Sequence, residues 1–255
     1  MSPWLAGFTI FFGYPLVMSV YLSFTHYNLL SPAKWVGLGN YRYLLHTDPQ
    51  VGVAIKNSLW FIAIAVPLQV LFAFGIALML ARARRGLGFF RTIFYLPALA
   101  PPVAATLGFV YLLNPATGPI NTLLAHVGVN GPLWFQSPNW SKPSLTLLSI
   151  WGVGNTMIIF LAAILDVPKH LYESAELDGA GRWQSFSRVT IPMIRPTVLF
   201  SVVTSTIGGL QIFTEPLLFT SPTGGSQGQG LTMTLFLYGQ AVNSFKFGYA
   251  CAIAV

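Results

Sequence analysis

Five charged side chains stand close together in a sequence that otherwise carries few charges. Glu173, Glu176 and Asp178 are three of the six acidic residues, and Arg182 and Arg188 follow them. Carboxylates gathered in this way could act as acids and bases, or they could rim a surface on which another protein docks. The residues around the cluster bear on the choice between these two uses.

Three apolar side chains, Leu177, Trp183 and Phe186, accompany these charges. A loop that is merely solvated has no need of them, whereas a short exposed helix with an apolar face and a polar rim can enter a groove in another protein. The solvated loop stays open as an alternative. Docking is favoured over it, and a catalytic site is not expected here.

The same stretch predicts two short helices joined by a turn. Lys169–Leu177 has the composition of a helix, and Gly179 and Gly181 allow a break or a close backbone approach. A second short helix is expected over 181–190. Pro192 marks the point where the chain returns to an apolar segment.

The composition predicts a membrane protein. Only 7% of the residues are charged and 54% are hydrophobic, whereas soluble domains carry about 25% charged residues. The apolar residues form blocks of about 20, the length that crosses a bilayer as a helix. We expect an all-α, polytopic membrane protein with about six transmembrane helices in one domain, 1–255. The expected spans lie near 4–24, 57–81, 92–113, 144–165, 197–220 and 247–255, with a loop at 169–192.

Several expected spans contain proline, which removes a backbone hydrogen bond and kinks a helix. The prolines are Pro15, Pro67, Pro97, Pro101 and Pro102. Two interpretations stay open. Membrane helices tolerate proline in general, and kinked helices also shape the central cavity of a transporter.

The basic residues predict the orientation. If the loops after the second and fourth spans face the cytoplasm, they hold eight basic residues: Arg82, Arg84, Arg85, Arg91, Lys169, Arg182, Arg188 and Arg195. The opposite loops hold five: Lys34, Arg42, Lys56, Lys142 and Lys246. The positive-inside rule therefore places the N-terminus and the charged stretch in the cytoplasm. We expect Arg82, Arg84 and Arg85 to anchor this topology and to contact lipid headgroups, and we expect no nucleic-acid partner.

Polar residues inside the expected spans are candidates for a solute pathway. Glu215 is the only acid within an apolar span, and Gln211 lies one helical turn before it. Asn155 and Thr156 lie midway along the fourth span, with Trp151 one turn earlier. Such residues could contact a sugar, or they could join helices by hydrogen bonds. Both interpretations stay open. The four scattered histidines predict no metal site, and no phosphate-binding loop is present in the sequence.

The charged stretch resembles a known motif. In permease subunits of bacterial ABC importers the EAA motif reads Glu-Ala-Ala, three residues, Gly, nine residues, then Ile-x-Leu-Pro. The matching positions here are Glu173, Ser174, Ala175, Gly179, Val189, Ile191 and Pro192. "YESAELDGAGRWQSFSRVTIPMIRP" and "FFRTIFYLPALAPPVAA" are similar to the branch that imports sugars of the maltose, lactose and glycerol-phosphate type. In "TEPLLFTSPTGG" Ser226 follows where that branch often has proline, which leaves the shape of this loop open.

This resemblance implies a function. The loop would be a coupling helix that seats in a cytoplasmic ATPase dimer, through Glu173, Ser174, Ala175, Asp178, Gly179, Ala180, Trp183, Phe186 and Pro192. It also implies a second permease subunit, an extracytoplasmic binding protein, a location in the bacterial plasma membrane and an oligosaccharide as solute. The chain would carry no cofactor and would not itself be an enzyme.

Two other classes of protein were weighed against this one. An ion-coupled transporter or channel would call for more buried charges than Glu215, and a membrane enzyme would need a constellation of catalytic residues inside the spans. Both chain ends are expected to be incomplete. A chain that stopped at Val255 would have a half-length last helix and is expected to assemble poorly.

Overall fold

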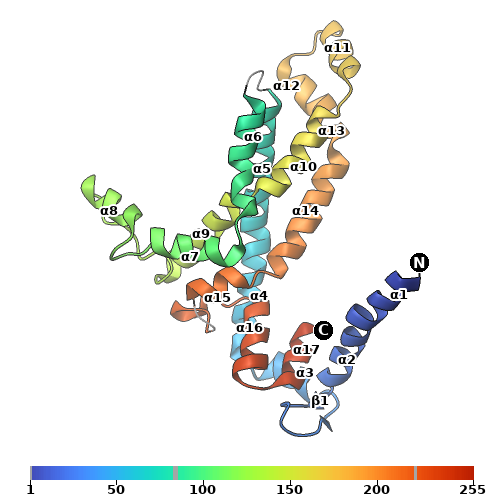
Figure 1. The fold of residues 1–255 in the computed structure, drawn as a ribbon, viewed down its shortest axis with the longest axis vertical. Coiled ribbons are helices and arrows are strands. Elements are labelled where there is room, and N and C mark those ends of the chain that lie inside the picture. Colours follow the sequence, from blue (N-terminus) through green and yellow to red (C-terminus); the bar gives the residue numbers. More distant parts are fainter. Residues whose placement is uncertain (1, 83–85, 221–222) are drawn as a thin grey trace. The chain divides into compact units, whose positions relative to one another are not determined.

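The computed structural model describes residues 2–82, 86–220 and 223–255. Regular structure in these residues is almost entirely helical, which confirms the all-α class (Figure 1). A small antiparallel pair of strands, β1 (Thr25–His26) and β2 (Lys34–Trp35), lies between two helices. Arg84 and Arg85, which were expected to anchor the topology, lie outside the described residues.

The chain divides into two compact units, of which the first consists of residues 1–59, 135–141 and 211–255. Seven residues of its core pack together from α4, α16, α17 and the loop before α16: Val51, Ala54, Leu231, Leu235, Phe236, Tyr249 and, partly buried, Ile253. The helices that begin in this unit are α1 (Ser2–Phe8), α2 (Tyr14–Ser23), α3 (Gly39–His46), α4 (Pro49–Trp60), α9 (Pro138–Trp151), α15 (Thr214–Thr220), α16 (Met233–Tyr238) and α17 (Phe247–Ala254).

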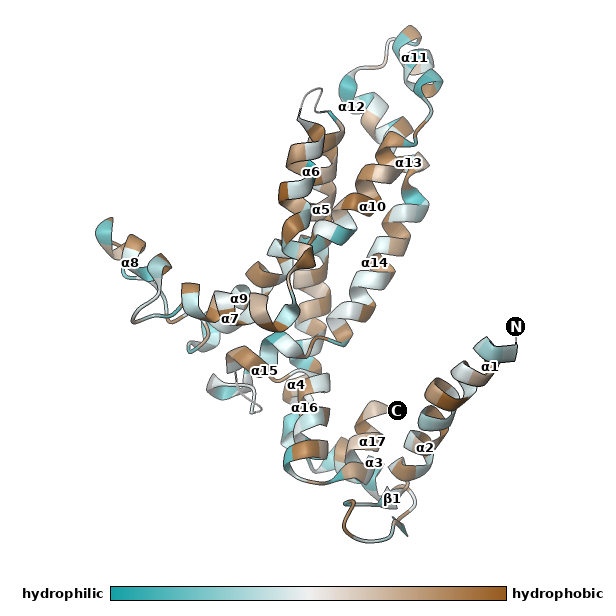
Figure 2. Ribbon diagram, in the orientation of Figure 1, coloured by the Kyte–Doolittle hydropathy of each residue, from teal (hydrophilic) through white to brown (hydrophobic). Residues whose placement is uncertain are grey.

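The second unit consists of residues 60–134 and 142–210. The helices that begin in it are α5 (Val66–Ala81), α6 (Leu87–Tyr95), α7 (Pro102–Leu112), α8 (Pro119–His126), α10 (Gly154–Leu165), α11 (Lys169–Leu177), α12 (Arg182–Ser185), α13 (Ile191–Met193) and α14 (Arg195–Leu210). Hydrophobic residues dominate α5 and α10, as Figure 2 shows.

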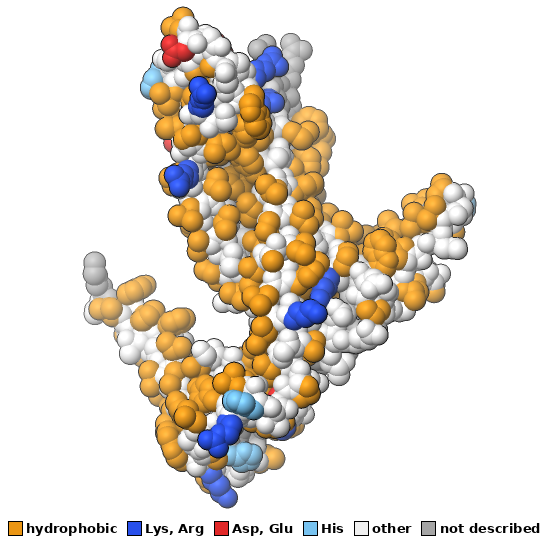
Figure 3. Space-filling model, turned by 180° about the vertical axis from the view of Figure 1, so that it is seen from behind, with side chains coloured by type: hydrophobic (Ala, Val, Ile, Leu, Met, Phe, Trp, Pro, Cys, Tyr) orange, Lys and Arg blue, Asp and Glu red, His pale blue; other side chains and the backbone are white. Residues whose placement is uncertain are grey.

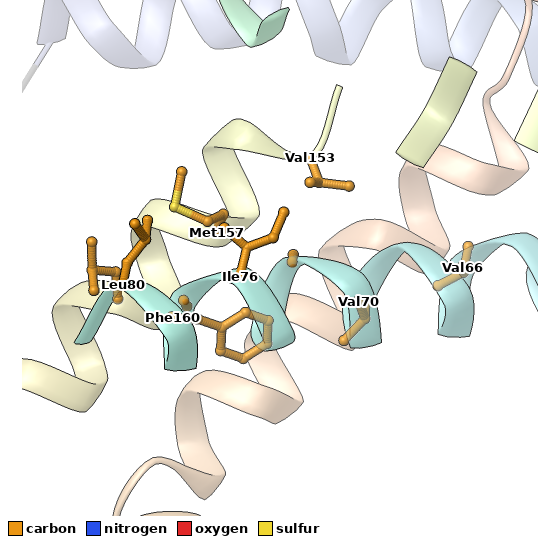
Figure 4. Close-up of a cluster of buried hydrophobic side chains, with 10 residues drawn as sticks. Val66, Val70, Ile76, Leu80, Val153, Met157 and Phe160 are labelled. Atoms are coloured by element: carbon orange, nitrogen blue, oxygen red, sulfur yellow. The ribbon is translucent and has the colours of Figure 1, made fainter. Parts of the chain in front are cut away.

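Helices α5 and α10 form the core of the second unit (Figure 4). Ala73 and Ala77 are fully buried, and such small residues let two helices approach closely in lipid, where packing rather than the hydrophobic effect joins helices. Met157 and Phe160 of α10 are also fully buried. The ring of Phe160 meets the ring of Phe74 edge-on, with 5.3 Å between their centroids.

Three prolines follow short π-helical turns. The turns are Thr9–Gly13, Phe61–Ala65 and Phe186–Thr190, and each ends two residues before a proline. In each one, the residue before the proline donates its N–H to the carbonyl oxygen five positions back. Proline has no N–H and its ring clashes with the carbonyl group four positions back. The wider turn keeps the helix continuous around that clash.

The π turn before Pro67 also shifts the pattern of burial. The helix that contains it, Pro49–Ala81, is 33 residues long. Buried residues recur three or four apart at 51, 54, 58, 61 and 65 up to the end of the turn, and again at 66, 70, 73, 77 and 80 after it, so the row shifts by one residue at the turn. One extra residue in the turn therefore keeps this row on one side of the helix.

Other breaks bend helices sharply. Leu87–Leu99 and Pro102–Leu112 meet at 96°. Ala100, which precedes Pro101, is extended with ψ 134°, because a residue before proline is forced out of the helical region. By length and composition, Ser2–Ser23 and Pro49–Ala81 can each cross a membrane, and three bent pairs bring the number to five among the described residues.

The segment expected as a span at 197–220 is not one continuous helix. Helix α14 ends at Leu210, residues 211–213 are not helical, and α15 begins at Thr214. The carbonyl oxygen of Ile212 in this break accepts a hydrogen bond of 3.1 Å from Thr232 Oγ1. A distant side chain thus supplies a partner that the helix would otherwise have supplied.

Asn57 in α4 holds the loop before α16 in place. Its Nδ2 donates to the carbonyl oxygens of Gly228 and Leu231 at 2.8 and 2.9 Å, and the side chain is buried. The neighbouring Ser58 Oγ accepts the N–H of Met233 at 3.0 Å. Two consecutive polar residues of one helix thereby fix the loop whose shape the sequence left open.

Asn57→Leu should lower the free energy of unfolding by about 1–3 kcal/mol, because the buried carbonyl group of Leu231 and the partly buried one of Gly228 lose their partner. Thermal unfolding of the purified protein in detergent measures this loss. The matched control is Asn243→Leu at an exposed position of the same unit, which should change little. Equal melting temperatures for the two variants would contradict the role of Asn57.

Candidate functional site

Helix α11 has the bounds that its composition predicts, Lys169–Leu177. Pro168 precedes it in an extended conformation, with ψ 131°, so α11 is not a continuation of α10. Gly179 ends the helix with φ +77°, in the left-handed region that favours glycine. The break expected at this glycine is confirmed.

The turn after α11 is fully hydrogen-bonded. The N–H of Ala180 donates to the carbonyl oxygen of Ala175 at 2.8 Å, and the N–H of Gly179 donates to that of Glu176 at 3.0 Å. This pair of bonds is a Schellman motif, which satisfies the last carbonyl groups of a helix. Gly181 then caps the start of α12, and its N–H donates to Gln184 Oε1 at 2.8 Å. The turn therefore has one defined shape.

Two contacts hold the loop in place: one joins it to α5, and the other ties its two ends together. Phe186 stacks on Phe74 of α5 with 6.2 Å between ring centroids, and Trp183 packs on the same Phe186 at 5.4 Å. The hydroxyl groups of Tyr172 in α11 and Thr190 lie 2.9 Å apart and share a hydrogen bond. The loop is therefore attached to α5, and within it α11 is tied to the turn that leads into α13.

The outer surface of the loop combines bare apolar groups with charges. Leu177 is 90% exposed and Trp183 is 75% exposed. Glu173 and Asp178 are exposed beside them, as is Ser174, whereas Ala175, Ala180 and Phe186 are partly buried. Hydrophilic residues gather at α11 and α12 in Figure 2, and charged side chains gather there in Figure 3. The geometry matches an apolar tip with a polar rim.

Trp151, Asn155 and Thr156 lie at a bend rather than along one helix. Trp151 is the last residue of α9, α10 begins at Gly154, and the two helices meet at 49°. The ring of Trp151 packs on Phe109 at 5.4 Å, and the Asn155 side chain is exposed. The expectation that these three residues follow one continuous helix is wrong, although they remain close in sequence around the bend.

Gln211 and Glu215 do not share a helix face, which corrects the prediction that they lie one turn apart. The break after α14 separates them, since Gln211 lies in it and Glu215 lies in the first turn of α15. Gln211 is exposed and Glu215 is partly buried. These two residues belong to the first unit, whereas Trp151, Asn155 and Thr156 belong to the second.

Sequence reasoning missed Phe74, Tyr172 and Thr190, the residues that attach the loop. Tyr172 and Thr190 are 18 positions apart, and no local pattern links them. Phe74 lies in a uniformly apolar helix, where the pattern of residues does not reveal which side chain meets the loop. Only the packing of α5 against the loop identifies it.

Long apolar helices, several of them bent, together with an exposed loop of two short helices define a multi-pass membrane protein. Comparison with known proteins gives the family. Residues 69–255 match the family described as "Binding-protein-dependent transport system inner membrane component". The chain belongs to this family of transport permeases, as the EAA motif predicted.

Its relatives are similar over the whole chain. A probable ABC transporter permease protein, YesP of Bacillus subtilis, is 35% identical over 255 residues, which cover 100% of this chain and 82% of YesP. The lactose transport system permease protein LacF of Rhizobium radiobacter is 34% identical over 260 residues, covering 100% of this chain and 86% of LacF. A crystal structure of a bacterial alginate ABC transporter, in complex with its alginate pentasaccharide-bound periplasmic protein, has a chain with a TM-score of 0.85 and 26% identity, covering 99% of this chain and 85% of that one.

Tyr172→Phe should loosen α11, because it removes the hydrogen bond to Thr190, which contributes about 0.5–1.5 kcal/mol. Hydrogen–deuterium exchange of the amides in 169–177 should become faster by roughly two- to tenfold. Tyr95→Phe in α6 is the matched control, since the Tyr95 hydroxyl makes no hydrogen bond to a described residue. Unchanged exchange in Tyr172→Phe would show that this bond does not hold the loop.

Proposed function

We propose that this chain is a permease subunit of an ABC importer for an oligosaccharide, and that α11 and α12 dock into a cytoplasmic ATPase dimer. The observation that carries the proposal is the exposed apolar tip, Leu177 and Trp183, on a turn of defined shape. An exposed helix with an apolar face fits a groove in a partner. The match of Glu173, Gly179 and Pro192 to the EAA motif supports the ATPase as that partner.

The attachments of the loop suit a coupling role. A force applied to α12 reaches α5 through the stack of Phe186 on Phe74, and a force on α11 reaches the start of α13 through Tyr172 and Thr190. A loop joined to the spans only by flexible chain would absorb such a movement. The proposed loop passes movement of the ATPase dimer on to the helices, and the chain itself hydrolyses no ATP.

The remaining partners follow from the family and its relatives. A binding protein on the outer side delivers the solute, as the alginate transporter is seen with its periplasmic protein. The names of LacF and of the alginate transporter support a sugar, and an oligosaccharide in particular. We further propose that a second, related permease subunit pairs with this chain.

The solute pathway is proposed to pass the helix breaks. Irregular backbone at membrane depth is tolerated only where it is buried in protein or lines a water-filled cavity. Trp151, Asn155 and Thr156 flank the bend between α9 and α10. Gln211 and Glu215 flank the break after α14. Each group combines polar side chains with a helix end, a suitable combination for hydrogen bonds to sugar hydroxyl groups.

Gly179→Trp should weaken binding of the ATPase at least tenfold while leaving membrane insertion intact. A side chain at Gly179 meets open space, so the effect comes from the backbone, where a left-handed non-glycine residue costs about 1–2 kcal/mol and reshapes the turn. Gly179→Asn is the matched control, because asparagine tolerates this conformation better. Co-purification with the partner permease and the ATPase subunit measures the loss.

Two outcomes would contradict the coupling proposal. One is retention of the ATPase by Gly179→Trp, and the other is failure of the wild-type chain to bind any ATPase. The wider proposal is tested by uptake of a labelled oligosaccharide into proteoliposomes. Uptake should need ATP on the side of α11 and the binding protein on the other side. Uptake that follows an ion gradient without ATP would replace the importer with an ion-coupled transporter.

The proposed orientation places the N-terminus and α11 in the cytoplasm. In a Cys251→Ser background expressed without the ATPase subunit, Leu177→Cys should react with a membrane-impermeant maleimide only after the cells are opened. Leu30→Cys, in the loop between β1 and β2, should react in intact cells. Both leucines are highly exposed, at 90% and 87%, so a difference in labelling reports the side of the membrane. The reverse pattern would invert the topology.

A further inference from the structure

A pocket of about 630 Å³ lies where the charged loop meets the ends of two spans. Its walls come from the end of α5, the end of α10, and α11 with α12, all in the second unit (Figure 1). This volume falls in the usual range of about 300–1,000 Å³ for small-molecule sites. The pocket shares Ala180 and Phe186 with the expected docking surface, whereas Leu177 and Trp183 of the tip do not line it.

The two halves of the pocket differ in chemistry. The half formed by the spans is apolar and includes Leu78 of α5, with Ile164 and Leu165 of α10. The remainder carries charge, and the charge is unbalanced: three basic residues, Arg82, Lys169 and Arg182, line it together with one carboxylate, that of Glu176. A ligand that suits both halves has an anionic head joined to apolar chains.

The three basic groups are available to such a ligand. In the described part of the chain, none of Arg82, Lys169 and Arg182 forms an ion pair. They come from three different elements, since Arg82 follows α5, Lys169 begins α11 and Arg182 begins α12. Donors that converge from separate elements can surround a phosphate group, which a row of cations on one helix cannot do.

The position of the pocket favours a lipid over a soluble anion. Arg82 follows directly on an apolar helix whose length and composition suit a membrane span, so it lies at the depth of the headgroups. Basic pockets between transmembrane helices at this depth bind the headgroups of anionic lipids. A soluble phosphate compound would leave Leu78 and Ile164 without a partner.

We propose that this pocket binds one anionic phospholipid. Arg82, Lys169 and Arg182 hold its phosphate group, and the parts of its acyl chains nearest the glycerol lie on Leu78 and Ile164. The bound lipid joins the loop to the ends of α5 and α10. Lipid composition then tunes how firmly the loop is attached to the spans. The proposal rests on the membrane location of the chain and not on its coupling to an ATPase.

Native mass spectrometry of the full-length protein in detergent tests the site. Phosphatidylglycerol, which is anionic, is titrated beside phosphatidylcholine, which is zwitterionic. The triple variant Arg82→Gln/Lys169→Gln/Arg182→Gln should lose affinity for phosphatidylglycerol by roughly a hundredfold, about fivefold for each basic residue removed. Its affinity for phosphatidylcholine should stay the same.

A second triple variant removes the same charge outside the pocket. Arg91→Gln/Arg188→Gln/Arg195→Gln changes three exposed basic residues that do not line it, and its affinity for phosphatidylglycerol should fall by less than threefold. Glu176→Gln removes the carboxylate of the lining and should raise the affinity severalfold. This single change keeps the proposal testable if the first triple variant does not fold.

Three results would overturn the proposal. Equal losses in the two triple variants would mean that diffuse surface charge attracts the lipid. Binding of glycerol phosphate as tight as that of phosphatidylglycerol would assign the pocket to a soluble phosphate compound. Loss of phosphatidylglycerol from the wild-type chain when the ATPase subunit is added would mean that an acidic part of a partner protein occupies the pocket.

Discussion

Hydrogen bonding of the backbone is the constraint on which the rest of this structure depends. Inside a bilayer an unpaired N–H or C=O group costs several kcal/mol, so every interruption of a helix needs a substitute partner. Proline interrupts the hydrogen bonding of a helix. Before Pro15, Pro67 and Pro192 a π turn compensates, because the residue ahead of each proline donates its N–H to the carbonyl oxygen five positions back. Where the helix does break, at Ile212, the hydroxyl group of Thr232 fills the gap. For the same reason, the Asn57 side chain donates to two backbone carbonyl oxygens in the loop before α16.

The sequence was informative where a local rule determines the shape. Helix α11 and its end at Gly179 follow from composition and from the conformational freedom of glycine. Hydropathy measures how apolar a segment is and not whether its helix is continuous, so the break at Ile212 was invisible to it. The π turn at Phe61–Ala65 shifts the buried row by one residue, which a strict helical period does not anticipate. The bonds of Asn57 join positions more than 170 residues apart, beyond the reach of any local pattern.

The loop of α11 and α12 and the helices below it have complementary mechanical properties. The loop has a hydrogen-bonded turn, a stack of Phe186 on Phe74 and a hydrogen bond between Tyr172 and Thr190. These contacts make it a rigid element. The helices, in contrast, bend by 49°, 64° and 96° at short interruptions. A transporter that alternates between two openings needs both, because rigid elements carry displacement and bends absorb it. The positions of these bends are therefore natural places for the helices to reorient.

The bare tip of the loop has a consequence for the life of the protein in the cell. Leu177 and Trp183 lie outside the spans with most of their surface uncovered. Exposed apolar groups of this kind are what chaperones and proteases recognise in unfinished proteins, and they promote aggregation. In a correctly folded copy of this chain whose tip no partner covers, chaperones and proteases could still bind the exposed apolar residues. Balanced synthesis of the subunits would then determine how many copies survive, and the tip would mark each unassembled copy for removal.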